Sequence, residues 1–291
     1  VLIASASLQV CWLMAIWWTG ATVNVEKLLV LIACSLGVVF FIYRAPTAVL
    51  YRIRQDGLAI LPRSGIRDVL ALSVVVIVVG TIYSIYQGFE TLVAEGGVYN
   101  ASLLVAREGL ASLFAQYGQL HWLGIQHPPF VPILNGFALW LFVEDLLVVR
   151  LLSLVFGLGT VLALYGLGRE LYDREVGLLA SLAFLCFPYC FRLSAAASND
   201  IQVTFFFVLT LLIAFRLRRR PSMSLAIMGG VVLGMGILSK YPMLLVYPVL
   251  AHILWIIRSQ RVARRCLMLL LLVSLAITFL WIVFVYRLGI F

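Results

Sequence analysis

Apolar stretches of about 17 to 25 residues recur along this chain, and no other feature restricts its fold as strongly. A stretch of that length can cross a hydrocarbon core of about 30 Å as a helix with every backbone group bonded internally. Of the 291 residues, 64% are hydrophobic and only 11% are charged. A soluble domain, in which about half of the residues are apolar, is thereby excluded. The sequence predicts an all-α, polytopic transmembrane helical bundle.

The apolar stretches predict about nine membrane spans. They lie near residues 1–19, 24–43, 68–87, 146–167, 175–193, 201–216, 223–239, 241–257 and 267–286. The first two spans and the basic linker behind them form a predicted N-terminal hairpin unit, residues 1–66. Residues 67–291 form the predicted core, in which residues 88–145 make one long loop with juxtamembrane helices.

Arginines between the spans predict the orientation. Four segments hold five, two, four and four arginines, namely residues 44–67, 168–175, 216–220 and 258–265. Basic loops are retained in the cytoplasm. The N-terminus is therefore predicted in the cytoplasm and the 88–145 loop on the opposite side. Nothing in the distribution of the +9 net charge resembles the continuous stripe of a nucleic-acid interface.

The apolar stretch 129–143 is too short to count as a crossing, and counting it would move both later arginine clusters outside. We expect an interfacial helix there instead. Earlier in the same loop, apolar residues at helical spacing from Tyr99 to Tyr117 predict a helix lying on the membrane. Long loops in compact proteins are often functional, so function is expected in residues 88–145.

Four short stretches in the second half of the chain resemble the GT-C superfamily of membrane glycosyltransferases, especially the branch of the protein O-mannosyltransferases and the lipid A aminoarabinose transferase. They are HPPFVPILNGFALWLF (127–142), VRLLSLVFGLGTVLALYGLGRELYDREVGLLASLAFLCFP (149–188), FRLSAAASND (191–200) and GILSKYP (236–242). Their order, spacing and predicted sidedness agree with that family. The resemblance implies transfer of a sugar from a polyprenyl-phosphate carrier to an acceptor at the outer membrane surface.

Two acids are the candidate catalytic residues. The family usually has an Asp-Glu pair early in its first external loop, and this sequence has none there. Glu95, in EGGVY, is the nearest substitute for the base, although a solvated loop acid is an equal reading. Asp200 stands where the family has an acid near its active site. Ser198, Asn199 and Asp200 also have the composition of a helix cap, and both roles can hold together.

Three cationic or titratable residues are the candidates for binding the donor phosphate. His127 begins the resemblance as His-Pro-Pro, Arg192 lies near a predicted membrane surface, and Lys240 lies between two apolar halves at a matching family position. Each has a plainer reading. His127 can be a hydrogen-bonded structural histidine, and Arg192 and Lys240 can extend to the interface or pair with an acid.

No cofactor is identified by the sequence. A divalent metal at His127 and the nearby His121 is conceivable, but two loop histidines do not define a metal site. The five cysteines lie in apolar spans without zinc or redox spacing. Expected partners are the polyprenyl-phosphate sugar, membrane lipids and other membrane proteins, with no nucleic acid.

The leading functional hypothesis is therefore a polyprenyl-phosphate-dependent glycosyltransferase of the bacterial inner membrane. The alternative is a non-catalytic subunit that kept the fold without the acid pair and serves as a scaffold in a larger membrane complex. A transporter ranks last, because no inverted repeat is evident. The opening Val1 and the end directly after an apolar span at Phe291 suggest a fragment of a longer protein.

Overall fold

The computed structural model describes residues 66–86, 93–119 and 127–287, and every regular element within these ranges is helical. The all-α prediction is thus confirmed for the described part of the chain. The predicted N-terminal hairpin, with its basic linker up to residue 65, lies outside the described residues.

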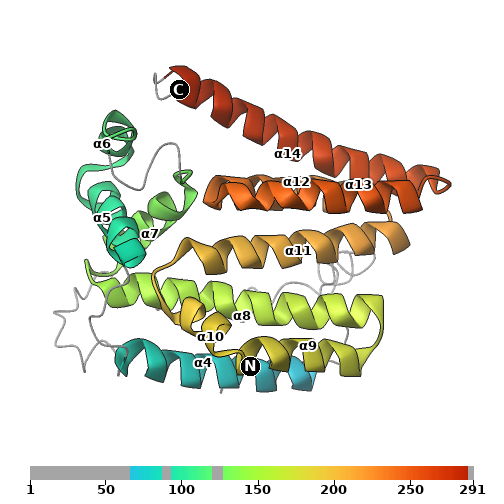
Figure 1. Cartoon of the computed structure of the whole chain (residues 1–291), viewed down its shortest axis with the longest axis horizontal. Helices are drawn as coiled ribbons and strands as arrows, with labels where there is room; N and C mark the ends of the chain where they lie inside the picture. The colour runs from blue at the N-terminus through green and yellow to red at the C-terminus, as the bar shows by residue number, and fades with distance from the viewer. Residues whose placement is uncertain (1–65, 87–92, 120–126, 288–291) are drawn as a thin grey trace, which may run out of the picture.

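Seven long segments run roughly side by side and form the body of the bundle (Figure 1). They are α4 (Ile66–Tyr86), α8 (Leu146–Leu171), α9 (Arg174–Cys186), α11 (Asn199–Arg219), α12 (Met223–Ser239), α13 (Val246–Ile256) and α14 (Arg261–Arg287). A 3-10 turn, η2 (Tyr241–Leu245), leads into α13. Within the described ranges, α8, α11 and α14 are long and apolar enough to cross a membrane by length and composition. These helices make the chain a membrane protein.

Three further helices lie at one end of this body, at the left in Figure 1, and we call that end the cap end. They are α5 (Val93–Glu108), α6 (Leu110–Ala115) and α7 (Phe130–Leu141). With 12 residues, α7 spans about 18 Å, too little to cross a bilayer core. The predicted short helix in residues 129–143 is therefore present at the length that the sequence indicated.

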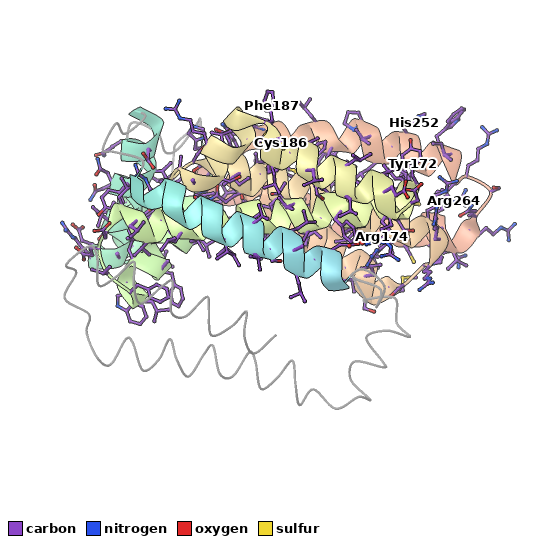
Figure 2. The ribbon with its side chains drawn as sticks, turned by 90° about the horizontal axis from the view of Figure 1, so that it is seen from below. Tyr172, Arg174, Cys186, Phe187, His252 and Arg264 are labelled. Atoms are coloured by element: carbon purple, nitrogen blue, oxygen red, sulfur yellow. The ribbon has the colours of Figure 1, made fainter. Side chains whose placement is uncertain are left out.

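The opposite end of the bundle carries arginines, and we call it the basic end. Figure 2 shows Tyr172, Arg174 and Arg264 together at this end, away from α5 and α7. Arg218, Arg219 and Arg220 end α11 there and are exposed. Buried Asp68 of α4 accepts hydrogen bonds from Arg174 at 2.7 and 2.6 Å, which fixes the start of α9 against α4. Of the arginine-rich segments predicted to share one side, the three that the structure describes in full, residues 168–175, 216–220 and 258–265, lie at one end.

Two predicted helices are interrupted. The predicted span 175–193 ends at Cys186 and restarts as α10 (Pro188–Ala195), with Phe187 in an extended conformation. Proline has no N–H for the helix interior, so a new helix begins at Pro188. The predicted surface helix from Tyr99 to Tyr117 is two helices, because Gly109 adopts φ = +86° between α5 and α6. Residues with side chains rarely adopt that conformation.

Close packing of α8 against its neighbours sets the position of α11 and of the turn before it. A Cβ at Gly157 would lie 2.7 Å from Ser194 Cβ, and one at Gly159 would lie 2.6 Å from the Phe205 ring. These glycines let α10 and α11 approach the α8 backbone. The start of α11 is consequently held at the cap end, beside the start of α8.

Candidate functional site

Glu95 and Arg150 form a buried ion pair at the cap end. Glu95 lies in the first turn of α5 and is 1% exposed, and Arg150 lies in the second turn of α8. The guanidinium donates to both carboxylate oxygens, at 2.9 and 3.1 Å. Glu95 also accepts from the backbone N–H of Ala197 at 2.8 Å. One carboxylate therefore joins α5, α8 and the turn before α11.

The turn before α11 presents Asp200. Ser198 is the N-cap, and its hydroxyl accepts from the Asp200 N–H at 3.1 Å and donates to Asp200 Oδ2 at 3.0 Å. The predicted helix cap is thus confirmed. The Asp200 side chain is 41% exposed, in contrast to Glu95. Its second oxygen, Oδ1, points to a cation on another helix.

That cation is Lys240, at the C-cap of α12. Its ammonium lies 2.5 Å from Asp200 Oδ1, and the lysine side chain is 25% exposed. The α-helix ends at Ser239, Lys240 is extended, and Tyr241-Pro242 begins the 3-10 turn. The structure therefore brings together two of the predicted site residues, and the lysine meets an acid at the end of the helix.

The charges of Lys240 and Asp200 both affect the pKa of the His127 imidazole. Its carbonyl accepts a hydrogen bond from the hydroxyl of buried Tyr117 at 2.8 Å. Burial lowers the pKa of the His127 imidazole below its usual value, and the positive charge of Lys240 lowers it further, while Asp200 acts in the opposite direction. An imidazole that senses both charges lies near both. It is largely neutral at pH 7.

Arg192 is not part of this group. It lies near the end of α10, and its side chain is exposed. Among the described residues, no hydrogen bond or ion pair joins Arg192 to the Asp200–Lys240 pair or to His127. A role in phosphate binding remains a prediction for this residue.

A third ion pair holds the outer surface of the cap. Arg107 donates to Glu144 at 2.8 Å, and the Tyr99 hydroxyl donates to the Glu144 carbonyl at 3.0 Å. Asp145 caps α8 by accepting from the Leu147 N–H at 2.7 Å. The exposed end of α5 is thereby attached to the start of α8, so α5 is fixed at both of its ends.

The groups at the cap end can take a proton and bind an anion. Asp200 is an accessible carboxylate and therefore a candidate general base. Lys240 has three N–H donors and uses one of them on Asp200, so it can bind a phosphate oxygen at the same time. Within the described ranges, no three His, Cys, Asp or Glu residues are arranged to hold a metal ion. His121 lies outside those ranges.

Sequence reasoning did not identify Arg150 and Tyr117 as residues of the candidate site. A signal for Arg150 existed, because a charged residue inside an apolar span is expensive and usually has a partner. Tyr117 gave no such signal, since its partner is a backbone carbonyl ten residues away.

The fold and these groups define a helical membrane protein with an acid–cation pair at one end of its bundle. Residues 126–284 match the dolichyl-phosphate-mannose-protein mannosyltransferase family, which is more than half of the chain. The chain belongs to this family, and the predicted GT-C resemblance is confirmed.

A curated relative agrees with this assignment. Over 117 residues the chain is 29% identical to the lipid A galacturonosyltransferase RgtD of Rhizobium johnstonii (strain DSM 114642 / LMG 32736 / 3841). The matched part covers 40% of this chain and 25% of the relative, so the chain spans about a quarter of that protein's length. No solved structure matches the chain.

Proposed function

We propose that this chain carries the membrane-embedded transfer site of a glycosyltransferase that uses a polyprenyl-phosphate sugar donor. The observation that carries the proposal is the Asp200–Lys240 pair, at 2.5 Å, with His127 in electrostatic range of both. The family and the relative in Rhizobium are both named for transfer of a sugar. An accessible base beside a phosphate-binding cation is what such a transfer requires.

In the proposed step, the acceptor hydroxyl oxygen attacks the anomeric carbon of the donor sugar. The bond between that carbon and the phosphate oxygen breaks, and its electron pair leaves with the polyprenyl phosphate. The proton of the acceptor hydroxyl goes to the Asp200 carboxylate. Lys240 stabilises the additional negative charge on the leaving phosphate. Arg192 on α10 would also bind the donor phosphate, as the sequence predicted.

Glu95 has a different place in this proposal. The sequence predicted it as the base, but its carboxylate already accepts three hydrogen bonds, two from Arg150 and one from Ala197. A base needs a lone pair within reach of the substrate. We therefore assign proton transfer to Asp200 and treat Glu95 as the positioning residue that fixes the turn carrying Asp200. Its catalytic role remains a prediction that the experiment below tests.

The proposal includes a membrane orientation. The cap end faces the non-cytoplasmic side of a bacterial inner membrane, and the basic end faces the cytoplasm together with the N-terminus. The arginines of the basic end support this orientation, because basic loops are retained in the cytoplasm. The full chain would then cross the membrane about nine times, with residues 1–66 as an added hairpin.

The test is transfer of labelled sugar from a polyprenyl-phosphate donor, with mannose and galacturonic acid as the two sugars tried, to membranes of the producing cell. The full protein is compared with Asp200→Asn, Glu95→Gln and the exposed-site control Glu144→Gln. We expect transfer by the native protein, loss with Asp200→Asn and retention with Glu144→Gln. Failure of the native protein to transfer either sugar, while it remains folded, would overturn the assignment for these donors.

A second candidate is a non-catalytic membrane subunit that acts as a scaffold or assembly partner. The observation that favours it concerns Glu95. This acid, the nearest to the family's usual catalytic position, is 1% exposed and already accepts hydrogen bonds from Arg150 and Ala197. For such a subunit, Asp200→Asn would leave the phenotype unchanged, and the protein would co-purify with a larger membrane complex.

A further inference from the structure

Three packed helices bury polar side chains that have no hydrogen-bond partner. Both amide atoms of Asn135 on α7, both amide atoms of Gln202 on α11 and the hydroxyl of Ser153 on α8 are buried without a partner within the described part of the chain. Each of these three residues is 0% exposed. Asn199 Oδ1, one turn before Gln202, is also buried without a hydrogen-bond partner in the described part of the chain. Native proteins rarely leave such groups unsatisfied.

Aromatic rings lie deeper in the bundle than these groups and form a floor. The Phe206 ring centroid is 5.7 Å from that of Phe130 and 5.9 Å from that of Phe156, so α7, α8 and α11 meet there. Gln202 precedes Phe206 by one turn of α11, and Ser153 precedes Phe156 by one turn of α8. Both polar residues therefore lie in the layer between the aromatic floor and the cap end.

The opposite side of this layer is apolar packing near the cap. Leu139 of α7, Val149 of α8 and Ala197 belong to one buried cluster. Ser153 follows Val149 by one turn, and Asn135 precedes Leu139 by one turn. Asn135 lies between the floor and this cluster along α7, as Ser153 does along α8. The three helices thus place amide and hydroxyl groups at one level, which we call the polar layer.

We infer that the polar layer of Asn135, Ser153 and Gln202 is the binding site for the hydroxyl groups of the transferred sugar, an inference that rests on the proposed function. Two amides and a hydroxyl both donate and accept, which matches sugar hydroxyls and not a phosphate. The aromatic floor offers an apolar surface for the ring. Gln202 follows Asp200 by two residues on α11, so the layer lies next to the groups proposed to bind the phosphate and take the proton.

The layer is closed to solvent in this structure, because its amides are fully buried. Access requires α7 to separate from α8 and α11. The ligand-free state keeps unpaired amides, and the sugar hydroxyls, not the carrier, supply their hydrogen-bond partners. A site that depends on amides to bind hydroxyls also rejects a ligand that lacks them.

The experiment is thermal unfolding of the full protein in detergent, with decaprenyl phosphate and with decaprenyl-phosphate mannose or galacturonate. The variants are Asn135→Leu, Gln202→Leu and the control Asn100→Leu, which changes an exposed asparagine of α5. We expect the sugar-bearing carrier to bind more tightly than the bare carrier. Each layer variant should weaken that added affinity about tenfold and leave binding of the bare carrier unchanged.

The ligand-free protein gives the second measurement. Replacing an unsatisfied buried amide by an apolar group of similar size should leave the ligand-free melting temperature unchanged or raised. The inference would be overturned if Asn135→Leu and Gln202→Leu lowered the melting temperature while the sugar-bearing carrier still bound more tightly than the bare carrier by the native amount. That result would show that buried water or neighbouring groups satisfy the amides. Failure of the bare carrier to bind would instead contradict the proposed function.

Discussion

Two acid–cation pairs at the cap end of this molecule have opposite surroundings. The Glu95–Arg150 pair is 1% and 7% exposed at its side chains, and the acid accepts three hydrogen bonds. The Asp200–Lys240 pair is 41% and 25% exposed and joins the two residues through one carboxylate oxygen. The first pair is shielded from a substrate by burial, whereas the second is accessible to one.

The difference separates a structural role from a chemical one. Removing one member of a buried pair leaves an uncompensated charge in the interior, so it acts on stability. Removing one member of an accessible pair leaves a charge that water can solvate, so it acts on binding and chemistry. Four experiments test this distinction, from the largest expected effect to the smallest.

Breaking the buried pair should have the largest effect on stability. Glu95→Ala should lower the free energy of unfolding by about 3–5 kcal/mol, because Arg150 would remain buried and uncompensated. Thermal or denaturant unfolding in detergent measures it. The matched control is Glu144→Ala, which removes an exposed pair with Arg107 and should change stability by at most about 1 kcal/mol. Equal, small effects of both variants would contradict the structural role of Glu95.

Asp200→Asn should act on chemistry instead. Loss of a general base lowers the transfer rate by about 100-fold or more. The Ser198 hydroxyl still accepts from the backbone N–H of residue 200, so the α11 cap and the melting temperature should be retained. Initial rates of labelled sugar transfer give the measurement. A rate within about threefold of the native rate, with the fold intact, would remove Asp200 from the proposed mechanism.

Lys240→Gln should weaken binding of polyprenyl phosphate by about tenfold, because it replaces a charged donor by a neutral one. Equilibrium binding of decaprenyl phosphate to the purified protein is the measurement. Arg192→Gln is the comparison, since Arg192 is exposed and no hydrogen bond or ion pair within the described ranges joins it to Asp200 or Lys240. A larger loss from Arg192→Gln than from Lys240→Gln would place the phosphate at α10 and separate it from Asp200.

The smallest effect concerns His127 and pH. Its folded-state pKa lies below the unfolded value of about 6.5. Between these two values the unfolded chain binds more protons than the folded protein, so stability is complete above about pH 6.5 and decreases as the pH falls through this interval. Melting temperatures between about pH 7.5 and 5 should show the decrease. His127→Gln should flatten it, and an unchanged profile in that variant would assign the effect to another group.

Much of the architecture followed from local pattern. Apolar runs predicted the long helices, and the arginine clusters correctly indicated which of the described turns share an end. The errors were local as well. The helix breaks at Pro188 and Gly109 depend on single residues, and hydrophobicity averaged over a span does not reveal them. The cap at Ser198 was predictable, because capping needs only neighbours in sequence.

The site was only half predictable. Asp200, Lys240 and His127 were identified as candidates, but nothing local indicated that Lys240 would pair with Asp200, 40 residues away. Glu95 was identified as an acid with two equal readings, and its partner Arg150, 55 residues away, was missed. The polar layer gave no sequence signal, because a single asparagine or glutamine in an apolar helix does not reveal what faces it.

The sequence by itself determined that this chain is a helical membrane protein whose described arginine-rich turns lie at one end of the bundle. Those properties depend on hydrophobicity and charge summed along short segments. The summed hydrophobicity decides whether a segment enters the bilayer, and the basic residues of short loops decide its orientation. Only the tertiary structure decided which acid is buried and which is accessible. Burial and pairing are set by the helices that pack around a side chain, and close contacts such as Gly159 against Phe205 fix those helices in space.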